Sequence, residues 1–408
     1  MAGAAILPSS RKRPRRCKHA LLSLPLDLLP EIAARSDPAT LVRCAATCKE
    51  LRRHIADPAF RASLRLRRHA DQRFVRPSLL RGGLVDRWNG NLMLVDDATA
   101  EVTGLLRAAA CFPRGADGKA AATHCRPLAA RDGLILFQWM VDRGSEEKLC
   151  VYHPATGRSQ ALPPGPRIPG QYVLLVGDSD GGAVGRQFQV LKACFVTPPG
   201  GWRSLQIHAL SSEQGTWAPR ARSSSPLIMH GDEELQRPGN PVVVGDTVQW
   251  LYHLNRSYYV LKLHVGAARV TFTELPKSFH RACRSLPPRD RTAQILMATS
   301  PSGRSPVVLV VNYDIVSAWA QSERTGKWTK RPELVRDCGV MKGRVGSLRL
   351  EWFAERSGVV LVAAPDSKTF LLDLRSKDIS KCCYSSASST IAYEMDVSSW
   401  VPTFTKIF

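Results

Sequence analysis

The sequence predicts an α+β multidomain chain, with a small N-terminal unit of three helices followed by an all-β domain that we expect to be a β-propeller of about six blades. Two observations predict this architecture. Apolar residues recur at helical spacing in the N-terminal part, and from about residue 90 the apolar period changes from 3.6 to 2. The expected segments are a disordered basic tail over 1–20, a helical domain over 21–68, a linker over 69–89 and the β domain over 90–408.

The helical unit shows repeated start signals. Leu24, Leu28 and Ile32 share one face at i, i+4 and i+8, and Asp-Pro pairs at 37–38 and 57–58 supply a cap followed by a first helical residue. Three helices of this length bury too little apolar surface to be very stable alone. We therefore expect the unit to be completed by a partner or by the following domain.

The β region repeats one pattern, a strand, a turn rich in Thr, Gly and Ser, and a second strand. Its turn centres recur every 50 to 60 residues, near Ala100, Gly157, Gly215, Gly266, Gly326 and Ser376. A period of that length built from hairpins is typical of propeller blades, and the runs between hairpins supply further strands. The last repeat could share strands with the N-terminal end to close the ring. A large β-sandwich, or two smaller β domains, remains the alternative.

Charge and cysteine content indicate which kind of partner and which cellular compartment to expect. The 408 residues carry a formal charge of +22, and residues 1–90 hold 19 Lys/Arg against 7 Asp/Glu, which suggests an acidic partner. The 11 cysteines show no CxxC pair and no zinc-ligand spacing, so we expect reduced thiols and no metal. Arg11–Lys18 resembles a nuclear import signal. We expect a nuclear or cytoplasmic protein. The sequence contains no run of 18 or more apolar residues, so it predicts no membrane span.

Catalytic motifs are missing from the sequence. There is no GxSxG elbow, no Walker loop and no GxGxxG, and the glycine-rich loop Asp178–Gly185 lacks the Lys and Ser/Thr of a phosphate loop. His153, at a predicted strand end, is interpreted as structural. We expect a protein that is not an enzyme, that needs no cofactor and that leaves any chemistry to a partner.

The helical stretch resembles the F-box. Its pattern of Leu-Pro, an acidic residue, a Leu pair and Glu-Ile is followed by a Leu-led helix, a Cys-Lys pair and a closing acidic-Pro-x-Phe. These elements are carried by Leu24, Pro25, Asp27, Leu28, Leu29, Glu31, Ile32, Leu41, Val42, Arg43, Cys44, Ala45, Cys48, Lys49, Asp57, Pro58 and Phe60. Two departures are Leu51, where the family usually has Trp, and Pro30 in the first helix.

The rest of the chain looks like the F-box-associated β-repeat region of plant F-box proteins. The best single match is Val151–Pro164, similar to that region's Trp-Asn-Pro-Ala-Thr-Gly strand-turn-strand, with Tyr152 and His153 in place of Trp and Asn. In this stretch Pro154 and Gly157 predict a tight turn in which the glycine takes a positive φ.

The resemblance implies the substrate-recognition subunit of a Skp-cullin-F-box ubiquitin ligase. Such a protein docks through its helices onto a Skp-type adaptor, and through it onto a cullin, while the β domain selects an unknown protein substrate. The residues that the resemblance implies for adaptor binding are Leu24, Pro25, Leu28, Leu29, Ile32, Leu41, Val42 and Leu51.

Two other functions stay open at this level. A nucleic-acid-associated regulator would explain the basic N-terminus, although aromatics do not interleave with the cations, so nucleic acid is not the expected partner. A propeller enzyme of the kelch-like oxidase or lyase type would need metal-ligating Tyr, His or Cys residues converging on the channel, and the sequence groups none.

Overall fold

The computed structural model describes part of the chain, and all structural statements concern that part. The described residues are 28–29, 32, 49–57, 59–60, 80–86, 92–95, 102–104, 124–140, 148–154, 156–167, 170–180, 183–196, 204–223, 240–254, 257–287, 291–313, 315–331, 348–382 and 390–394. The chain divides into two compact units, residues 1–55 and residues 56–408.

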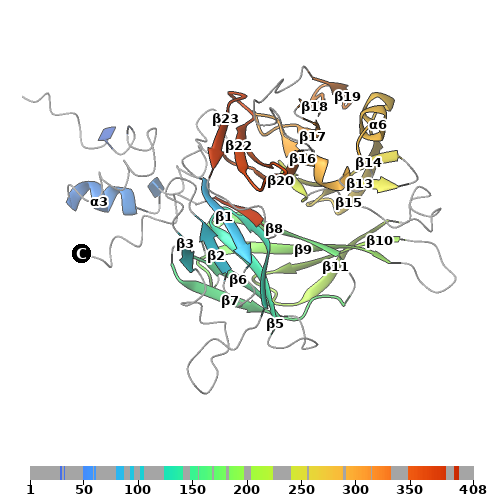
Figure 1. Cartoon of the computed structure of the whole chain (residues 1–408). Helices are drawn as coiled ribbons and strands as arrows, with labels where there is room; N and C mark the ends of the chain where they lie inside the picture. The colour runs from blue at the N-terminus through green and yellow to red at the C-terminus, as the bar shows by residue number, and fades with distance from the viewer. Residues whose placement is uncertain are drawn as a thin grey trace, which may run out of the picture. The chain divides into compact units, whose positions relative to one another are not determined.

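The N-terminal unit is helical wherever it is described. Leu28, Leu29 and Ile32 are helical, and α3 spans Lys49–Ala56 (Figure 1). Leu51 and Ile55 lie one turn apart on the same side of α3, and both are buried. The predicted tail over 1–20 lies outside the described residues, as do the start signal at 37–38 and the remaining helix bounds.

The second Asp-Pro start signal is confirmed by its geometry. Asp57 Oδ1 accepts the backbone N–H of Ala59 at 2.7 Å, and Ala59 and Phe60 are helical. A carboxylate in this position satisfies one of the N–H groups that the first turn of a helix leaves without a partner.

The larger unit is an all-β propeller domain. Its described strands form six four-stranded antiparallel sheets (Figure 1). One is composite, in the order β24 (Thr390–Glu394), β1 (Leu80–Asp86), β2 (Leu92–Val95) and β3 (Val102–Gly104). Next come β4 (His124–Arg131), β5 (Leu134–Met140), β6 (Lys148–His153) and β7 (Arg158–Leu162), and then β8 (Gly170–Asp180), β9 (Arg186–Val196), β10 (Ser204–Ser211) and β11 (Trp217–Ser223).

The other three sheets follow in chain order. They consist of β12 (Val242–Val244), β13 (Thr247–Leu254), β14 (Ser257–His264) and β15 (Arg269–Glu274); of β16 (Ile295–Thr299), β17 (Pro306–Asn312), β18 (Ile315–Gln321) and β19 (Trp328–Lys330); and of β20 (Arg349–Ala354), β21 (Val359–Ala363), β22 (Thr369–Asp373) and β23 (Ile379–Cys382). Between β15 and β16 the chain forms a helix, α6 (Lys277–Arg284), and a 3-10 turn, η4 (Arg291–Gln294), which the all-β expectation did not include.

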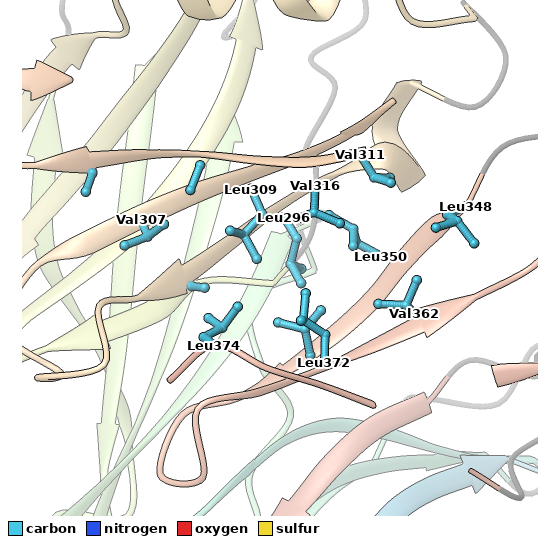
Figure 2. Packing of buried hydrophobic residues seen from close by; sticks show 14 of the residues in the cluster. Leu296, Val307, Leu309, Val311, Val316, Leu348, Leu350, Val362, Leu372 and Leu374 are labelled. Carbon is cyan, nitrogen blue, oxygen red and sulfur yellow. The ribbon is translucent and has the colours of Figure 1, made fainter. Parts of the chain in front are cut away.

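Apolar side chains between neighbouring sheets hold the ring together. Because strand residues alternate between faces, apolar side chains gather between neighbouring sheets, and clusters of this kind join β8–β11 to β12–β15 and β16–β19 to β20–β23. Figure 2 shows one such core, in which Leu309 and Val311 of β17 pack with Leu350 of β20 and Val362 of β21. The strand β24 contacts both β20 and β4, so the C-terminal strand closes the circle.

The six predicted hairpins fall one to each sheet, always as its third and fourth strands. The expected strands between them are β5, β12, β13, β17 and β21. Five sheets are blades of four consecutive strands, and the composite sheet joins the C-terminal β24 to β1–β3. The expectation of about six blades is therefore met only when the composite sheet is counted as a blade.

The predicted boundary of the β domain is wrong by one strand. β1 lies inside the segment 69–89 that the sequence assigned to a linker, so Leu80–Asp86 belongs to the β domain. Gly82 and Gly83 weaken the strand pattern of β1, because glycine has low β-propensity and no side chain to alternate. The strand forms because its backbone pairs with β24 on one side and with β2 on the other.

The hairpin turn predicted at Gly157 is confirmed. Gly157 has a φ of +70° and donates its N–H to His153 O at 2.9 Å. The equivalent turns at Gly215 and Gly326 have the same bond, to Ser211 O and Ser322 O, and the same positive φ. At the fourth predicted turn the left-handed residue is Ala268 rather than Gly266.

Candidate protein-binding sites

Two of the residues expected to meet an adaptor are exposed apolar side chains. Leu28 is 46% exposed and Ile32 is 49% exposed, and they lie one helical turn apart, while Leu29 is half-buried. Large apolar side chains exposed as neighbours are a common feature of protein-binding surfaces.

The other expected adaptor residues differ in position. Leu51 is only 7% exposed and is buried within the chain itself. Leu24, Pro25, Leu41 and Val42 lie outside the described residues, so their role stays a prediction.

In the propeller, the first strands of all six sheets surround a narrow central channel. Residues of β4, β8, β12, β16, β20 and β24 line a cavity of about 80 Å³ along it. At one end this channel borders a wider cavity of about 250 Å³, which we call the channel mouth. The channel mouth is lined by Arg131, Val243, Gly245, Thr299, Ser300, Pro301, Ser302, Gly303, Glu355, Arg356, Ser357, Gly358, Leu374 and Arg375.

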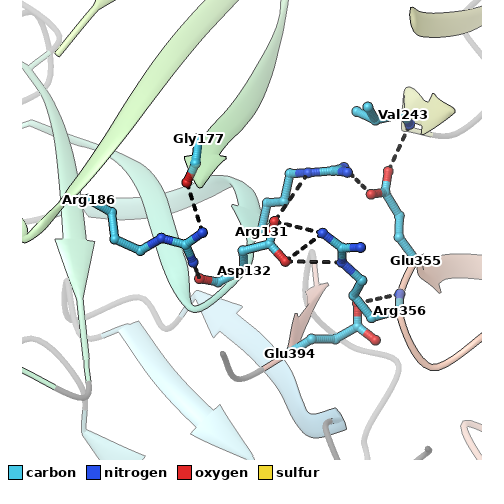
Figure 3. A network of polar contacts seen from close by, with 8 residues as sticks. All are labelled: Arg131, Asp132, Gly177, Arg186, Val243, Glu355, Arg356 and Glu394. Atoms are coloured by element: carbon cyan, nitrogen blue, oxygen red, sulfur yellow. Dashed lines mark hydrogen bonds and ion pairs between the residues drawn. The ribbon is translucent and has the colours of Figure 1, made fainter. Parts of the chain in front are cut away.

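Three charged residues of the channel mouth, Arg131, Glu355 and Arg356, are paired across blades (Figure 3). Arg356 donates from Nε to Asp132 Oδ1 and from Nη2 to Asp132 Oδ2, both at 3.0 Å. Arg131 donates from Nη1 to Glu355 Oε2, and Glu355 Oε1 accepts the Val243 N–H at 3.0 Å. Asp132 beside the guanidinium raises the pKa of Arg356, so this side chain stays cationic.

Glu394, the last residue of β24, joins this network from the closing strand. Its carboxylate accepts the N–H of Arg356 at 2.9 Å and both the N–H and the hydroxyl of Ser357. Its backbone oxygen accepts the Gly133 N–H at 3.1 Å. Desolvation of the carboxylate raises the pKa of Glu394 above its ordinary value. The closing strand is thus bonded to the turns of both neighbouring sheets.

Arg186 anchors the network on the side of the next blade. It is 4% exposed and donates to Asp132 O at 3.1 Å and to Gly177 O at 2.9 Å. Its guanidinium therefore binds two backbone carbonyls, one in the turn after β4 and one in β8. Arg131 and Arg356 face carboxylates of other turns, so these ionic groups connect the blades around the channel mouth.

The sequence reasoning did not find this network. Its members come from hairpin turns, Arg131–Gly133 and Glu355–Gly358, and from a strand end more than 200 residues away from the first. The available signal was a charged pair one or two residues before a Gly at the end of a strand, in "ARDG" and "AERSG". That signal marks a turn with charges in it, but it does not say which turns meet.

The described residues bear on two kinds of chemistry, metal binding and thiol reactivity. No three His, Cys, Asp or Glu side chains among them are placed to hold a metal ion. The described cysteines, Cys125, Cys150, Cys194, Cys283 and Cys382, are buried, and none of them is assigned to a disulfide. Burial raises the pKa of Cys283 to about 12, so this thiol is not a thiolate nucleophile at neutral pH. No helix in the described part of the chain is long and apolar enough to cross a membrane.

Fold and sites together define a β-propeller protein that carries an F-box at its N-terminal side. Residues 21–63 match the F-box domain. Residues 120–406, most of the chain, match the family described as "Domain of unknown function (DUF7595)", and the chain belongs to that family.

Comparison with other proteins adds only distant likenesses. No curated protein matches the chain. Among solved structures, the chain is similar to TolB from Acinetobacter baumannii, with 11% identity and a TM-score of 0.41 over 78% of this chain and 68% of that one. It is also similar to the Dos1 propeller, with 10% identity and a TM-score of 0.34 over 76% and 71%. A protein from Lactobacillus plantarum shows 9% identity and a TM-score of 0.41 over 73% and 80%.

Proposed function

We propose that this protein is the substrate-recognition subunit of a Skp-cullin-F-box ubiquitin ligase. The observation that carries the proposal is the pairing of an F-box with a propeller domain in one chain. An F-box generally binds a Skp-type adaptor and has no catalytic role, and a rigid β scaffold presents loops that bind a target. The chain then acts as a non-catalytic adaptor, and the ubiquitin chemistry belongs to the cullin-bound partners.

The adaptor contact is proposed to include the exposed pair Leu28 and Ile32. Both side chains are about half exposed, so covering them with an apolar partner surface would remove apolar area from water. The buried Leu51 then acts from within, by holding α3 in place. The β region is proposed to serve as the F-box-associated regions of plant F-box proteins do, by selecting the target.

The proposal also assigns a compartment. Buried cysteines that are not assigned to disulfides, as at the five described positions, suit a reducing environment. We therefore infer the nucleus or the cytoplasm, with the basic cluster Arg11–Lys18 as a candidate import signal.

The adaptor contact is tested by co-purification with a Skp-type adaptor. We expect the full-length chain to retain the adaptor, and the double variant Leu28→Ser, Ile32→Ser to weaken retention by about tenfold or more. The matched control is Lys49→Ser, Arg53→Ser, two exposed positions one turn apart on α3, which should bind as the unchanged chain does. A wild-type chain that fails to retain the adaptor would overturn the proposed function. Equal retention by both double variants would remove Leu28 and Ile32 from the contact.

A further inference from the structure

The helix α6 is held rigidly against two sheets through its buried face. Phe279 contacts the rings of Trp319 and Tyr258 edge-on, with centroid distances of 5.1 and 5.3 Å. His280 Nε2 accepts the backbone N–H of Tyr258 at 3.2 Å. Phe279, His280 and Cys283 are all buried, so the orientation of the helix is determined by this side.

The opposite face of α6 is basic. Lys277, Arg281 and Arg284 recur at i, i+4 and i+7, and all three are exposed. The helix contains no acidic residue. The nearby carboxylate of Glu274 lies 4.0 Å from Nδ1 of His280, which belongs to the buried face. Within the described residues no ion pair involves any of the three cations.

A fourth cation continues this face onto β19. The Nζ of Lys330 lies 5.7 Å from the centroid of the Trp319 ring, and Nε1 of the same indole donates to Ser278 Oγ on α6 at 3.4 Å. One tryptophan thus joins the exposed Lys330 to the start of the helix. We call Lys277, Arg281, Arg284 and Lys330 the α6 ledge.

Two exposed apolar side chains lie on, or just before, the strand β18 that carries Trp319. Ile315 lies four residues before Trp319 on β18, and strand alternation places it on the same face of the sheet. It is 38% exposed, and Tyr313, at the tip of the preceding turn, is 66% exposed. Tyr313 has a φ of +53°, a conformation that costs a non-glycine residue free energy. An exposed aromatic kept in such a conformation is a candidate anchor for a bound protein.

We propose that the α6 ledge, with Tyr313 and Ile315, binds an acidic segment of a target protein that also carries an apolar residue. This proposal rests on the proposed function and extends it, because it specifies which kind of target segment the propeller domain binds. Acidic side chains complement the four cations, and an apolar side chain complements Ile315 and the Tyr313 ring. Nucleic acid is disfavoured, because a single aromatic forms no stacking platform and four cations are fewer than the six to ten phosphate contacts of typical DNA-binding proteins.

The test measures binding of a fluorescein-labelled peptide of repeated Glu-Glu-Leu to the full-length protein by fluorescence anisotropy. We expect binding at about 50 mM salt that weakens at about 200 mM salt. Lys277→Glu, Arg281→Glu should weaken it by about tenfold or more, because two attractions become repulsions. Tyr313→Gly, which relieves the backbone conformation, should weaken it by about fivefold.

The matched control is Arg269→Glu, Arg324→Glu, two exposed cations on the same two sheets that α6 joins, with the same change in net charge. This variant should bind the peptide within about twofold of the wild type. Equal weakening by the two double variants would overturn the proposal, because net charge or the basic N-terminal cluster would then explain binding. Absence of peptide binding at low salt, or stronger binding of a DNA oligonucleotide of equal charge, would also overturn it.

Adaptor co-purification, run in parallel, separates this proposal from the proposed function. We expect Lys277→Glu, Arg281→Glu to retain the Skp-type adaptor as the wild type does. If the wild type binds the adaptor but not the peptide, the proposal for the α6 ledge is wrong and the ligase role stands. If the wild type does not bind the adaptor, the proposed ligase role is wrong.

Discussion

Arg356 and Asp132 lie 224 residues apart in the chain and form a doubly hydrogen-bonded ion pair, with both N–O distances at 3.0 Å. Asp132 sits in the turn between β4 and β5, and Arg356 sits in the turn after β20. Since the composite sheet lies between those two blades, the pair bridges across the closing strand β24 (Figure 3). The closure of the propeller therefore rests on a charged network as well as on strand pairing.

Removing the arginine should destabilise the fold strongly. Arg356→Ala leaves the carboxylate of Asp132, which is 6% exposed, without its main counter-charge, and breaking a buried pair in this way costs about 3–5 kcal/mol. Urea unfolding measures the change. Arg349→Ala serves as control, because its pair with Glu351 is more exposed and should contribute less than about 1 kcal/mol. If both variants lose the same free energy of unfolding, the Arg356–Asp132 pair contributes no more to stability than the exposed Arg349–Glu351 pair.

Glu394 should make stability depend on pH in a predictable direction. Because its pKa is raised in the folded protein, the folded state holds a proton that the unfolded state releases. The stability from this group is fully present below its unfolded pKa, near 4.5, and is lost as the pH rises through the folded value. The free energy of unfolding of the wild type, relative to Glu394→Gln, should therefore fall as the pH rises above about 4.5. A difference that is flat or rises over this range contradicts the assignment.

The hairpin turns allow a comparison of two glycines in open surroundings. A Cβ at either Gly157 or Gly266 would meet no atom within 4 Å, but only Gly157 has a positive φ. Gly157→Ala should cost about 1–2 kcal/mol through backbone conformation alone. Gly266→Ala should be neutral or stabilising by about 0.5 kcal/mol, because alanine restricts the unfolded chain. Equal denaturant midpoints for the two variants would disprove this.

The core between blades should be sensitive to truncation. Leu309 is fully buried between the sheets β16–β19 and β20–β23, so Leu309→Ala should cost about 2–5 kcal/mol in lost burial and cavity formation. Ile315→Ala, an exposed position on the adjacent strand, should change stability by less than about 0.5 kcal/mol. Thermal unfolding, monitored by circular dichroism, measures the loss of stability in each variant.

Much of the fold was predictable because it is encoded locally. Period-2 patterns and turn residues such as Gly157 and Gly326 locate each hairpin without reference to any other part of the chain. β1 was missed because Gly82 and Gly83 erase the local pattern, and its place depends on pairing with β24. Of the residues predicted to bind an adaptor, Leu28 and Ile32 are exposed and Leu51 is buried, and sequence spacing does not separate those two cases.

The sequence by itself determined the F-box pattern, the repeated hairpins and the absence of familiar catalytic motifs, because each is written in residues close together in the chain. Only the tertiary structure decided which turns meet at the channel mouth, which strand closes the ring and which face of α6 is left exposed. Closing the ring brings Asp132, Arg356 and Glu394 together from distant segments. Contacts of that kind depend on how whole sheets pack, and no local pattern of residues records them.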